Sequence, residues 1–322
     1  MKELRFVSAQ PATTYYAWQV EVMLNNFREM DVNLNQVDIV CWVEGGCNCK
    51  RNEPPTVPEE WSKLADNYAA RFFFYKDHRD TKNYVSSIRP NILRQHWEAH
   101  PYLKEQAIFY HDCDIIFTKP PSQWIPSGIL NDDDWYGSDT RWYIAHSYVK
   151  SKGQDVIDAM CNIMEVDEKL IEDNELNSIG AQYLMKNVDA AYWDRVEKDS
   201  ERLFTEISAL NNQKKLADPT HHELQIWCAD MWAVLWGAWR LGYKTHCLPS
   251  FEFSWATSSE ADYFKFNIMH NAGAVDSTSG LFYKADYMNY YPYNEWLDVK
   301  EGTASWHYWS YIQKTAEKSV LL

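Results

Sequence analysis

Two carboxylates stand one residue apart between two apolar runs, at Asp112 and Asp114. Residues 107–110 read Ala-Ile-Phe-Tyr and residues 115–117 read Ile-Ile-Phe, so the pair lies at the end of an expected buried strand. Carboxylate oxygens held at such a position can bind Mg²⁺ or Mn²⁺ while the ion keeps open positions for substrate phosphates. This arrangement suits chemistry in which a diphosphate leaves.

The same spacing occurs again at Asp132 and Asp134, in the run Asp-Asp-Asp-Trp. This second run lies in a polar stretch and has the composition of an exposed turn. A solvated turn needs no ligand to explain its acids, whereas a buried strand has no structural need to end in two of them. We therefore expect a metal site at Asp112 and Asp114 only.

His270 and Lys284 are candidates to complete this site. His270 ends an expected strand and leads into Asn-Ala-Gly, and a neutral imidazole can complete a carboxylate site for Mn²⁺. A lone histidine is more often structural, but its position at a strand end matches that of Asp112. Lys284 could neutralise a departing diphosphate, although a solvated lysine is nearly as good an explanation.

Three further side chains could contact a substrate. Arg89, in the helix before the acidic strand, could pair bidentately with phosphate oxygens or simply be exposed. Gln182 could contact a sugar hydroxyl through its amide, or begin a helix. Asp230 stands beside Trp227, Met231 and Trp232, where a carboxylate is either tightly hydrogen-bonded or functional. Glu223 lies seven residues before Asp230 and would share its helical face.

The elements expected to position these residues form an α/β fold. Apolar strand 4–7, amphipathic helix 16–30 and apolar strand 37–43 favour a parallel sheet with a ligand crevice at the carboxyl ends of its strands. We expect further strands at 71–75, 107–110, 135–137, 245–248 and 263–269, helices at 61–68, 83–98, 155–166 and 223–241, and a charged, helical span over 165–215. One domain over 1–284 and an irregular, aromatic-rich tail over 285–322 packed on it complete the prediction.

Composition limits the classes of function. The net charge of −15 over 322 residues argues against a protein that mainly grips phosphate backbones, although a local basic groove can exist on an acidic protein. The 16 Trp and 21 Tyr are compatible with stacking on sugars, but aromatic residues also fill ordinary cores.

Sequence features relevant to compartment point to the cytoplasm. No run of about 18 apolar residues predicts a membrane span, and the first residues lack the apolar segment of a signal peptide, so we expect no secretion. The seven cysteines, an odd number, fit reduced thiols. Cys47 and Cys49 have no second pair to complete a zinc site, and we expect them in a loop.

Four motifs, in chain order, resemble a nucleotide-sugar glycosyltransferase of the GT-A fold: Asp112-x-Asp114, Gly180-Ala181-Gln182, Trp227-x-x-Asp230-Met231 and His270-x-x-Gly273. From about Leu4 to Lys284 the chain is most similar to the hydroxyproline O-arabinosyltransferases and peptidyl-serine galactosyltransferases of plants. The resemblance implies that Asp112 and Asp114 hold the metal and ribose, that His270 is a late metal ligand, and that Gln182 and Asp230 sit at the donor sugar and acceptor. It also implies retention of anomeric configuration.

The chain departs from the plant enzymes in two ways. They carry an N-terminal membrane anchor, which is not expected here, and their helix typically has Glu-Met where this chain has Asp230-Met231. The first departure suggests a prokaryotic or viral setting. Similar enzymes of T-even-like phages arabinosylate hydroxymethylated cytosine in DNA, so a modified base joins peptide and glycan hydroxyls as a possible acceptor.

The sequence thus predicts a glycosyltransferase that uses a UDP-sugar, pentose or hexose, with Mn²⁺ or Mg²⁺. We expect metal binding by Asp112, Asp114 and His270, and catalysis by Asp230 and Gln182. Donor binding is expected from Arg89, Asp112, Ser138, Asp139 and Lys284, and acceptor binding from Glu223 and Trp227. Two alternatives remain open at this point. One is an Asp-x-Asp metal phosphohydrolase with the first Asp as nucleophile, and the other is a non-catalytic carbohydrate-binding module.

Overall fold

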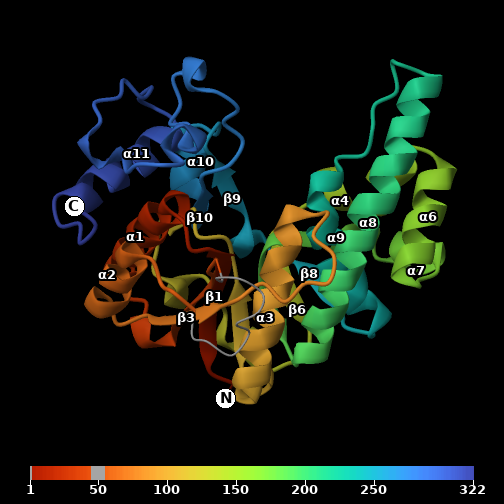
Figure 1. The fold of residues 1–322 in the computed structure, drawn as a ribbon, viewed down its shortest axis with the longest axis horizontal. Helices are drawn as coiled ribbons and strands as arrows, with labels where there is room; N and C mark the ends of the chain where they lie inside the picture. The colour runs from red at the N-terminus through yellow and green to blue at the C-terminus, as the bar shows by residue number, and fades with distance from the viewer. Residues whose placement is uncertain (1, 45–54) are drawn as a thin grey trace.

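A seven-stranded sheet forms the centre of the molecule in the computed structural model, which describes residues 2–44 and 55–322 (Figure 1). Its strand order is β3-β2-β1-β4-β7-β6-β8. Pairing is parallel from β3 to β4 and between β6 and β8, and β7 runs antiparallel to both neighbours. The bounds are Leu4–Pro11 (β1), Val37–Trp42 (β2), Arg71–Tyr75 (β3), Ala107–Tyr110 (β4), Trp135–Asp139 (β6), Ile179–Lys186 (β7) and Thr245–Cys247 (β8). The predicted fold class, a mixed and mostly parallel sheet flanked by helices, is confirmed.

A second, three-stranded sheet carries the segment after the acidic pair. It consists of β5 (Ile115–Phe117), β10 (Ile268–His270) and β9 (Phe253–Trp255), in that order. β10 runs antiparallel to β5 and pairs His270 with Ile115, while the backbone N–H of Asn271 donates to the carbonyl of Asp114 at 2.9 Å. This register brings residues 114 and 270 together although they are far apart in the chain.

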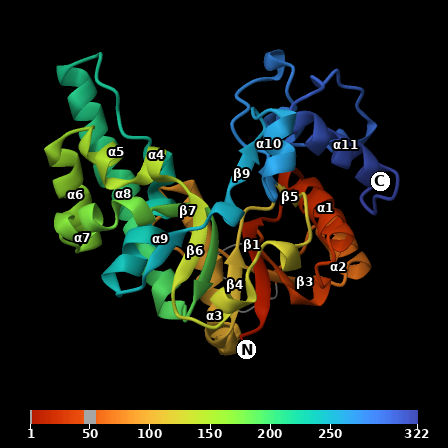
Figure 2. The same ribbon diagram turned by 180° about the vertical axis from the view of Figure 1, so that it is seen from behind.

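Helices cover both faces of the large sheet, and each face has its own hydrophobic core. One core joins α1 (Thr14–Glu29), α2 (Glu59–Asn67) and α11 (Ala304–Ala316) to sheet residues such as Phe6 and Phe109. The other joins α3 (Ile88–Ala99), α6 (Gln154–Met164), α8 (Ala190–Ala217) and α9 (Ala229–Arg240) to Val7 and Ile108. Figure 2 shows α6, α8 and α9 at one end of the sheet and α1, α2 and α11 at the other. Alternate side chains of each strand therefore face different cores.

The expectation of a helical span over 165–215 is wrong in its middle. After α7 (Glu168–Asp173), residues 179–186 form β7, which lies inside the sheet between β4 and β6. Buried Ile179, Tyr183, Leu184 and Met185 supply the apolar faces of this strand. The charged residues on both sides belong to α7 and α8, and they obscured the short apolar run between them.

Three other boundaries need correction. The helix expected at 223–241 begins at Ala229, after a 3₁₀ turn over Ile226–Cys228, so Glu223 lies outside it. The strand expected at 263–269 is a short helix, α10 (Glu260–Lys265), followed by β10, because Ser259 caps the helix by accepting from the N–H of Asp262. The tail expected to be irregular contains α11.

The C-terminal segment is tied to α1 through one buried carboxylate. Glu21 is inaccessible to solvent and accepts from the hydroxyls of Tyr293 and Ser319 at 2.6 and 2.7 Å and from the N–H of Val320 at 2.8 Å. These contacts explain why the last residues stay on the body of the protein. The proposed division of the chain at residue 284 remains a prediction.

Two sequence expectations concern features of the whole chain. No helix in the described ranges is long and apolar enough to cross a membrane. The five cysteines within these ranges are free thiols. The loop predicted at Cys47 and Cys49 lies outside the described residues.

Candidate active site

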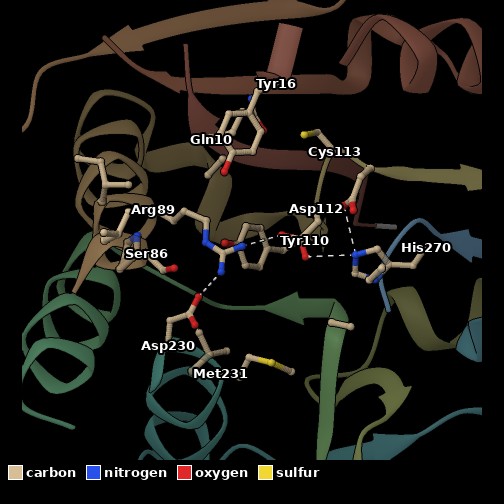
Figure 3. A pocket seen from close by; sticks show the side chains of 18 of the residues that line it. Gln10, Tyr16, Ser86, Arg89, Tyr110, Asp112, Cys113, Asp230, Met231 and His270 are labelled. Carbon is tan, nitrogen blue, oxygen red and sulfur yellow. Dashed lines mark hydrogen bonds and ion pairs between the residues drawn. The ribbon is translucent and has the colours of Figure 1, made fainter. Parts of the chain in front are cut away.

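A cavity of about 330 Å³ opens where the carboxyl ends of β1 and β4 meet the first turns of α3 and α9. Asp112, Asp114, His270, Arg89 and Asp230 all line it. Figure 3 shows Arg89 reaching across the cavity between Asp112 and Asp230, with His270 facing Asp112 from the opposite side. Residues from four separate parts of the sequence thus meet at one edge of the sheet, as expected for strand-end positions.

Asp112, Asp114 and His270 form a compact cluster of potential metal ligands. One ligand atom from each lies within 4.8 Å of the other two, and no other such cluster occurs among the residues that the structure describes. His270 Nε2 is 3.2 Å from Asp114 Oδ1 and 3.7 Å from Asp112 Oδ2. Two carboxylates and an imidazole suit Mn²⁺ or Mg²⁺, and the cavity side leaves room for further ligands. The predicted residues therefore fit a divalent cation.

Asp114 carries a buried negative charge beside Lys284 and His270. Burial by itself would raise its pKa, but the charge of Lys284 and the contacts with Lys284 and His270 outweigh burial and hold the pKa of this carboxyl well below its usual range. The Lys284 ammonium contacts Asp114 Oδ2 directly. Burial would lower the pKa of Lys284, yet Asp114 keeps it above the ordinary value. Both groups are therefore charged at neutral pH.

Arg89 links the acidic pair to α9. Its Nη1 donates to Asp112 Oδ1 at 2.6 Å, and its Nη2 donates to Asp230 Oδ2. The other oxygen of Asp230 accepts from the hydroxyl of Tyr84 at 2.7 Å. Desolvation would lower the pKa of Arg89, but Asp230 and its other acidic neighbours raise it well above the ordinary value. A fixed positive charge thus sits between two carboxylates at the cavity wall.

A buried carboxylate on α8 fixes the segment that leads into α3. Glu201 accepts from the backbone N–H groups of Asn83 and Tyr84 at 3.0 and 3.2 Å and from the hydroxyl of Ser87 at 2.5 Å. These bonds hold Tyr84 and the first turn of α3, and with them Arg89. Sequence reasoning missed both Glu201 and Tyr84, because neither stands at a strand end or in a motif of recognisable spacing.

A bulge in β7 shapes the cavity floor. Its pairing with β6 shifts between Gly137 and Ser138, and Ala181 adopts a left-handed backbone with φ of 60°. A Cβ on Gly180 would lie 2.6 Å from the Met231 methyl and 2.8 Å from Thr140 Oγ1, so only glycine lets α9 approach this closely. Ala181 and Met231 both line the cavity as a result.

The predicted residues divide into two groups. Asp112, Asp114, His270, Arg89, Lys284, Asp230 and Trp227 line the cavity together. Four do not. Gln182 and Ser138 are fully buried behind His270. Asp139, at the carboxyl end of β6, pairs with Arg141, and Glu223 is exposed, 3.7 Å from Lys215. The shared helical face predicted for Glu223 and Asp230 is wrong, because α9 begins after Glu223.

Tyr15 and Tyr16 are two lining residues that the sequence analysis did not single out. Both lie in the first turn of α1 and line the cavity, and Figure 3 shows Tyr16 beside it. Burial raises the pKa of Tyr16 to about 12, so its hydroxyl is protonated and can donate a hydrogen bond at neutral pH. Because they lie in a helix and not at the end of a strand, the strand-end pattern that identified Asp112 did not include them.

No protein-family model and no curated protein sequence matches the chain. Solved structures do show similarity. WbbM, a bifunctional glycosyltransferase, has a TM-score of 0.47 and 10% identity, over 96% of this chain and 52% of that chain, so this chain spans about half of its length. The galactosyltransferase LgtC, in complex with donor and acceptor sugar analogues, has a TM-score of 0.39 and 10% identity over 97% and 95% of the two chains. Mouse xyloside xylosyltransferase 1 has the same TM-score and identity over 84% and 97%.

Proposed function

We propose that the protein is a metal-dependent glycosyltransferase of the GT-A type that moves a sugar from a UDP-sugar to a hydroxyl acceptor. The observation that carries this proposal is the cluster of Asp112, Asp114 and His270 beside two fixed cations, Arg89 and Lys284, in one cavity. Such a combination suits a diphosphate better than a neutral ligand. The sequence resemblance points to the same chemistry.

Asp112, Asp114 and His270 would hold Mn²⁺ or Mg²⁺. The ion would supply positive charge to the diphosphate as the bond between sugar and phosphate breaks. Lys284 and Arg89 add to this charge from the protein. Each now contacts a carboxylate of the site, so each can exchange that contact for a phosphate oxygen when the donor enters. These are the roles that we assign to the two cations.

The reaction breaks the bond between the anomeric carbon and the UDP oxygen, and UDP leaves with the electron pair. A bond between the anomeric carbon and the acceptor oxygen forms, and the acceptor proton passes to an oxygen of the leaving phosphate. We assign Asp230 to the stabilisation of positive charge on the sugar, because its carboxylate faces the cavity and is oriented by Arg89 and Tyr84. We further propose transfer on the same face of the sugar, with retention, as the sequence resemblance implies.

The acceptor side is assigned to the wall formed by Trp227. Its side chain is 62% exposed although it lines the cavity, and an exposed indole face next to a reactive centre suits stacking on a sugar ring or a base. A modified DNA base, a peptide hydroxyl and a glycan hydroxyl all satisfy this requirement. Glu223 does not line the cavity and is not assigned to the acceptor site.

The proposal is tested by UDP release from a panel of UDP-pentoses and UDP-hexoses, with each acceptor class, in Mn²⁺ and in chelator. We expect one donor to release UDP only with metal, and faster with its acceptor. Release of phosphate from simple phosphate esters, with no turnover of any UDP-sugar, would favour the phosphohydrolase instead. Binding of free sugars without metal or nucleotide would favour a carbohydrate-binding module.

A further inference from the structure

Four polar groups form a row behind the metal cluster, from the backbone to His270. Ser138 Oγ is 2.7 Å from the carbonyl oxygen of Phe251 and 2.7 Å from the Gln182 side-chain amide. The other end of this amide is 3.3 Å from His270 Nδ1. Ser138 and Gln182 are inaccessible to solvent, so their polar atoms need hydrogen-bond partners within the protein.

The number of hydrogens available fixes the direction of every bond in the row. The Phe251 carbonyl has no hydrogen, so the single hydroxyl hydrogen of Ser138 must lie on that contact. Ser138 Oγ can then only accept from Gln182. An amide oxygen facing Ser138 would leave two oxygens 2.7 Å apart with no hydrogen between them. A half-turn of the amide, which exchanges its NH₂ and its oxygen, gives each of the three contacts one hydrogen.

In a neutral imidazole, this direction determines which nitrogen of His270 carries the proton and which is free to bind a cation. With the Gln182 oxygen toward the imidazole, Nδ1 must carry a hydrogen and donate it. The nitrogen on the other side of the ring, Nε2, is the one that lies 3.2 Å from Asp114 Oδ1 and 3.7 Å from Asp112 Oδ2. Nε2 can therefore present its lone pair to a cation between the carboxylates.

We propose that Gln182 is a positioning residue that holds His270 in its metal-binding tautomer, with Ser138 and the Phe251 carbonyl fixing the direction of its amide. This inference rests on the proposed function for the identity of the ligand, a divalent cation. It replaces a direct contact between Gln182 and the donor sugar. Hydrogen-bond partners of this kind typically change metal affinity about 10–100-fold when removed.

The first experiment reads the protonation of His270 directly. In protein labelled with ¹⁵N-histidine, the resonance of His270 is assigned by its loss in His270→Asn, and Nδ1 is examined without metal and with Mg²⁺. We expect Nδ1 to carry a proton in both states, and to lose this preference in Gln182→Leu. A bare Nδ1 in the unsubstituted protein would overturn the proposal.

The second experiment measures Mn²⁺ affinity by calorimetry in matched variants. Gln182→Leu should bind Mn²⁺ about 10–100-fold more weakly, whereas Gln182→Glu, which still accepts from Nδ1–H, should retain most of the affinity. Ser138→Ala should lie between them, and Gln213→Leu, on the exposed face of α8, should match the unsubstituted protein. Equal affinity of Gln182→Leu and the unsubstituted protein would contradict the proposed role, even if the variant melts at a lower temperature.

The two readouts separate this inference from the proposed function. Failure of the unsubstituted protein to bind Mn²⁺ or Mg²⁺ would contradict the proposed metal-dependent transferase. The metal-free Nδ1 measurement would still decide whether Gln182 sets the tautomer. Metal binding together with an Nδ1 that carries no proton would be consistent with the proposed transferase and would overturn the proposed role of Gln182.

Discussion

Asp114 is the residue at which the charges of the site converge. It is 4% exposed, contacts the Lys284 ammonium through one oxygen and lies 3.2 Å from His270 Nε2 through the other. Asp112 is more open and shares its charge with Arg89. The inner acid of the pair is therefore the stronger candidate for a permanent ligand, and its loss should affect both metal binding and the balance of buried charge.

Asp114→Asn keeps the shape of the side chain and removes its charge. We expect Mn²⁺ affinity, measured by electron paramagnetic resonance, to fall more than about 100-fold. A loss of about 100-fold is the most that is typical when a residue that only hydrogen-bonds to a metal ligand is removed. The variant should also melt at a lower temperature, because Lys284 keeps a buried charge without its partner. Adding Lys284→Met should recover part of the stability and none of the metal binding.

Asp133→Asn, on an exposed turn of the second acidic run, is the control and should bind Mn²⁺ normally. Normal Mn²⁺ affinity in Asp114→Asn would remove this residue from the metal site.

Trp227 gives a second prediction at this scale. Trp227→Ala should raise the KM for the acceptor about tenfold, equivalent to about 1.4 kcal/mol, because it removes one stacking face. The affinity for UDP should not change. Trp296→Ala is the matched control, since this side chain is 99% exposed and does not line the cavity. An unchanged acceptor KM together with weaker UDP binding would move Trp227 to the donor side.

Strand β7 contributes Ala181 and Tyr183 to the cavity, and it is also the strand that the sequence pattern did not predict. Its apolar run is short and lies between charged helices, so the charged character of the flanking residues led to the expectation of helix over 165–215. By contrast, β3 was predicted with its observed bounds, because Arg71–Tyr75 is a compact aromatic run with clear ends. The local sequence pattern predicts a strand poorly when most of the stabilisation of that strand comes from the neighbouring strands on both sides.

The bulge in β7 predicts opposite effects for two adjacent substitutions. Gly180→Ala should lower the free energy of unfolding by about 1–3 kcal/mol, because the new methyl group meets Met231 and buried Thr140. Ala181→Gly should be neutral or raise it by up to about 1 kcal/mol, since it removes a side chain from a left-handed backbone position. Urea unfolding measures both. Loss of stability in Ala181→Gly with none in Gly180→Ala would contradict the close contact at Gly180 and the left-handed backbone at Ala181.

At the scale of the whole molecule, a buried polar cluster joins β2, β3 and α3 below the site. Asp38 is fully buried and accepts from Arg5, from Arg71 and from His96, whose Nε2 is 3.2 Å away. Tyr75 contacts the other ring nitrogen of His96 at 3.0 Å. Burial lowers the pKa of His96, and the nearby charges of His100 and Arg71 act in the same direction, against the opposing effect of Asp38.

This cluster predicts a loss of stability in mild acid. The pKa of His96 is lower in the folded state than the roughly 6.5 of the unfolded chain, so only the unfolded chain takes up this proton as the pH falls from 7. The free energy of unfolding should therefore decrease between pH 7 and 5, by at most about 1.4 kcal/mol per pH unit for this group. His96→Asn should show a shallower dependence in urea unfolding at several pH values. An identical slope in both proteins would exclude His96 as the cause.

The candidate site was predictable where function coincides with strand ends. Asp112, Asp114 and His270 each follow or end a strand, and the sheet brings such positions together. The partners of these residues were less accessible to sequence reasoning. The contact between Arg89 and Asp230 depends on how α3 and α9 pack, and the burial of Gln182 depends on a bulge that no spacing rule reveals.

The most direct test of the central claim is the melting temperature of the protein with UDP, in the presence and absence of Mn²⁺. A ligand that binds only the folded state raises this temperature by mass action. The site described here predicts stabilisation by UDP that requires Mn²⁺ and disappears in Asp114→Asn. No stabilisation by UDP or any UDP-sugar, at concentrations well above about 1 mM, would contradict a nucleotide-sugar transferase.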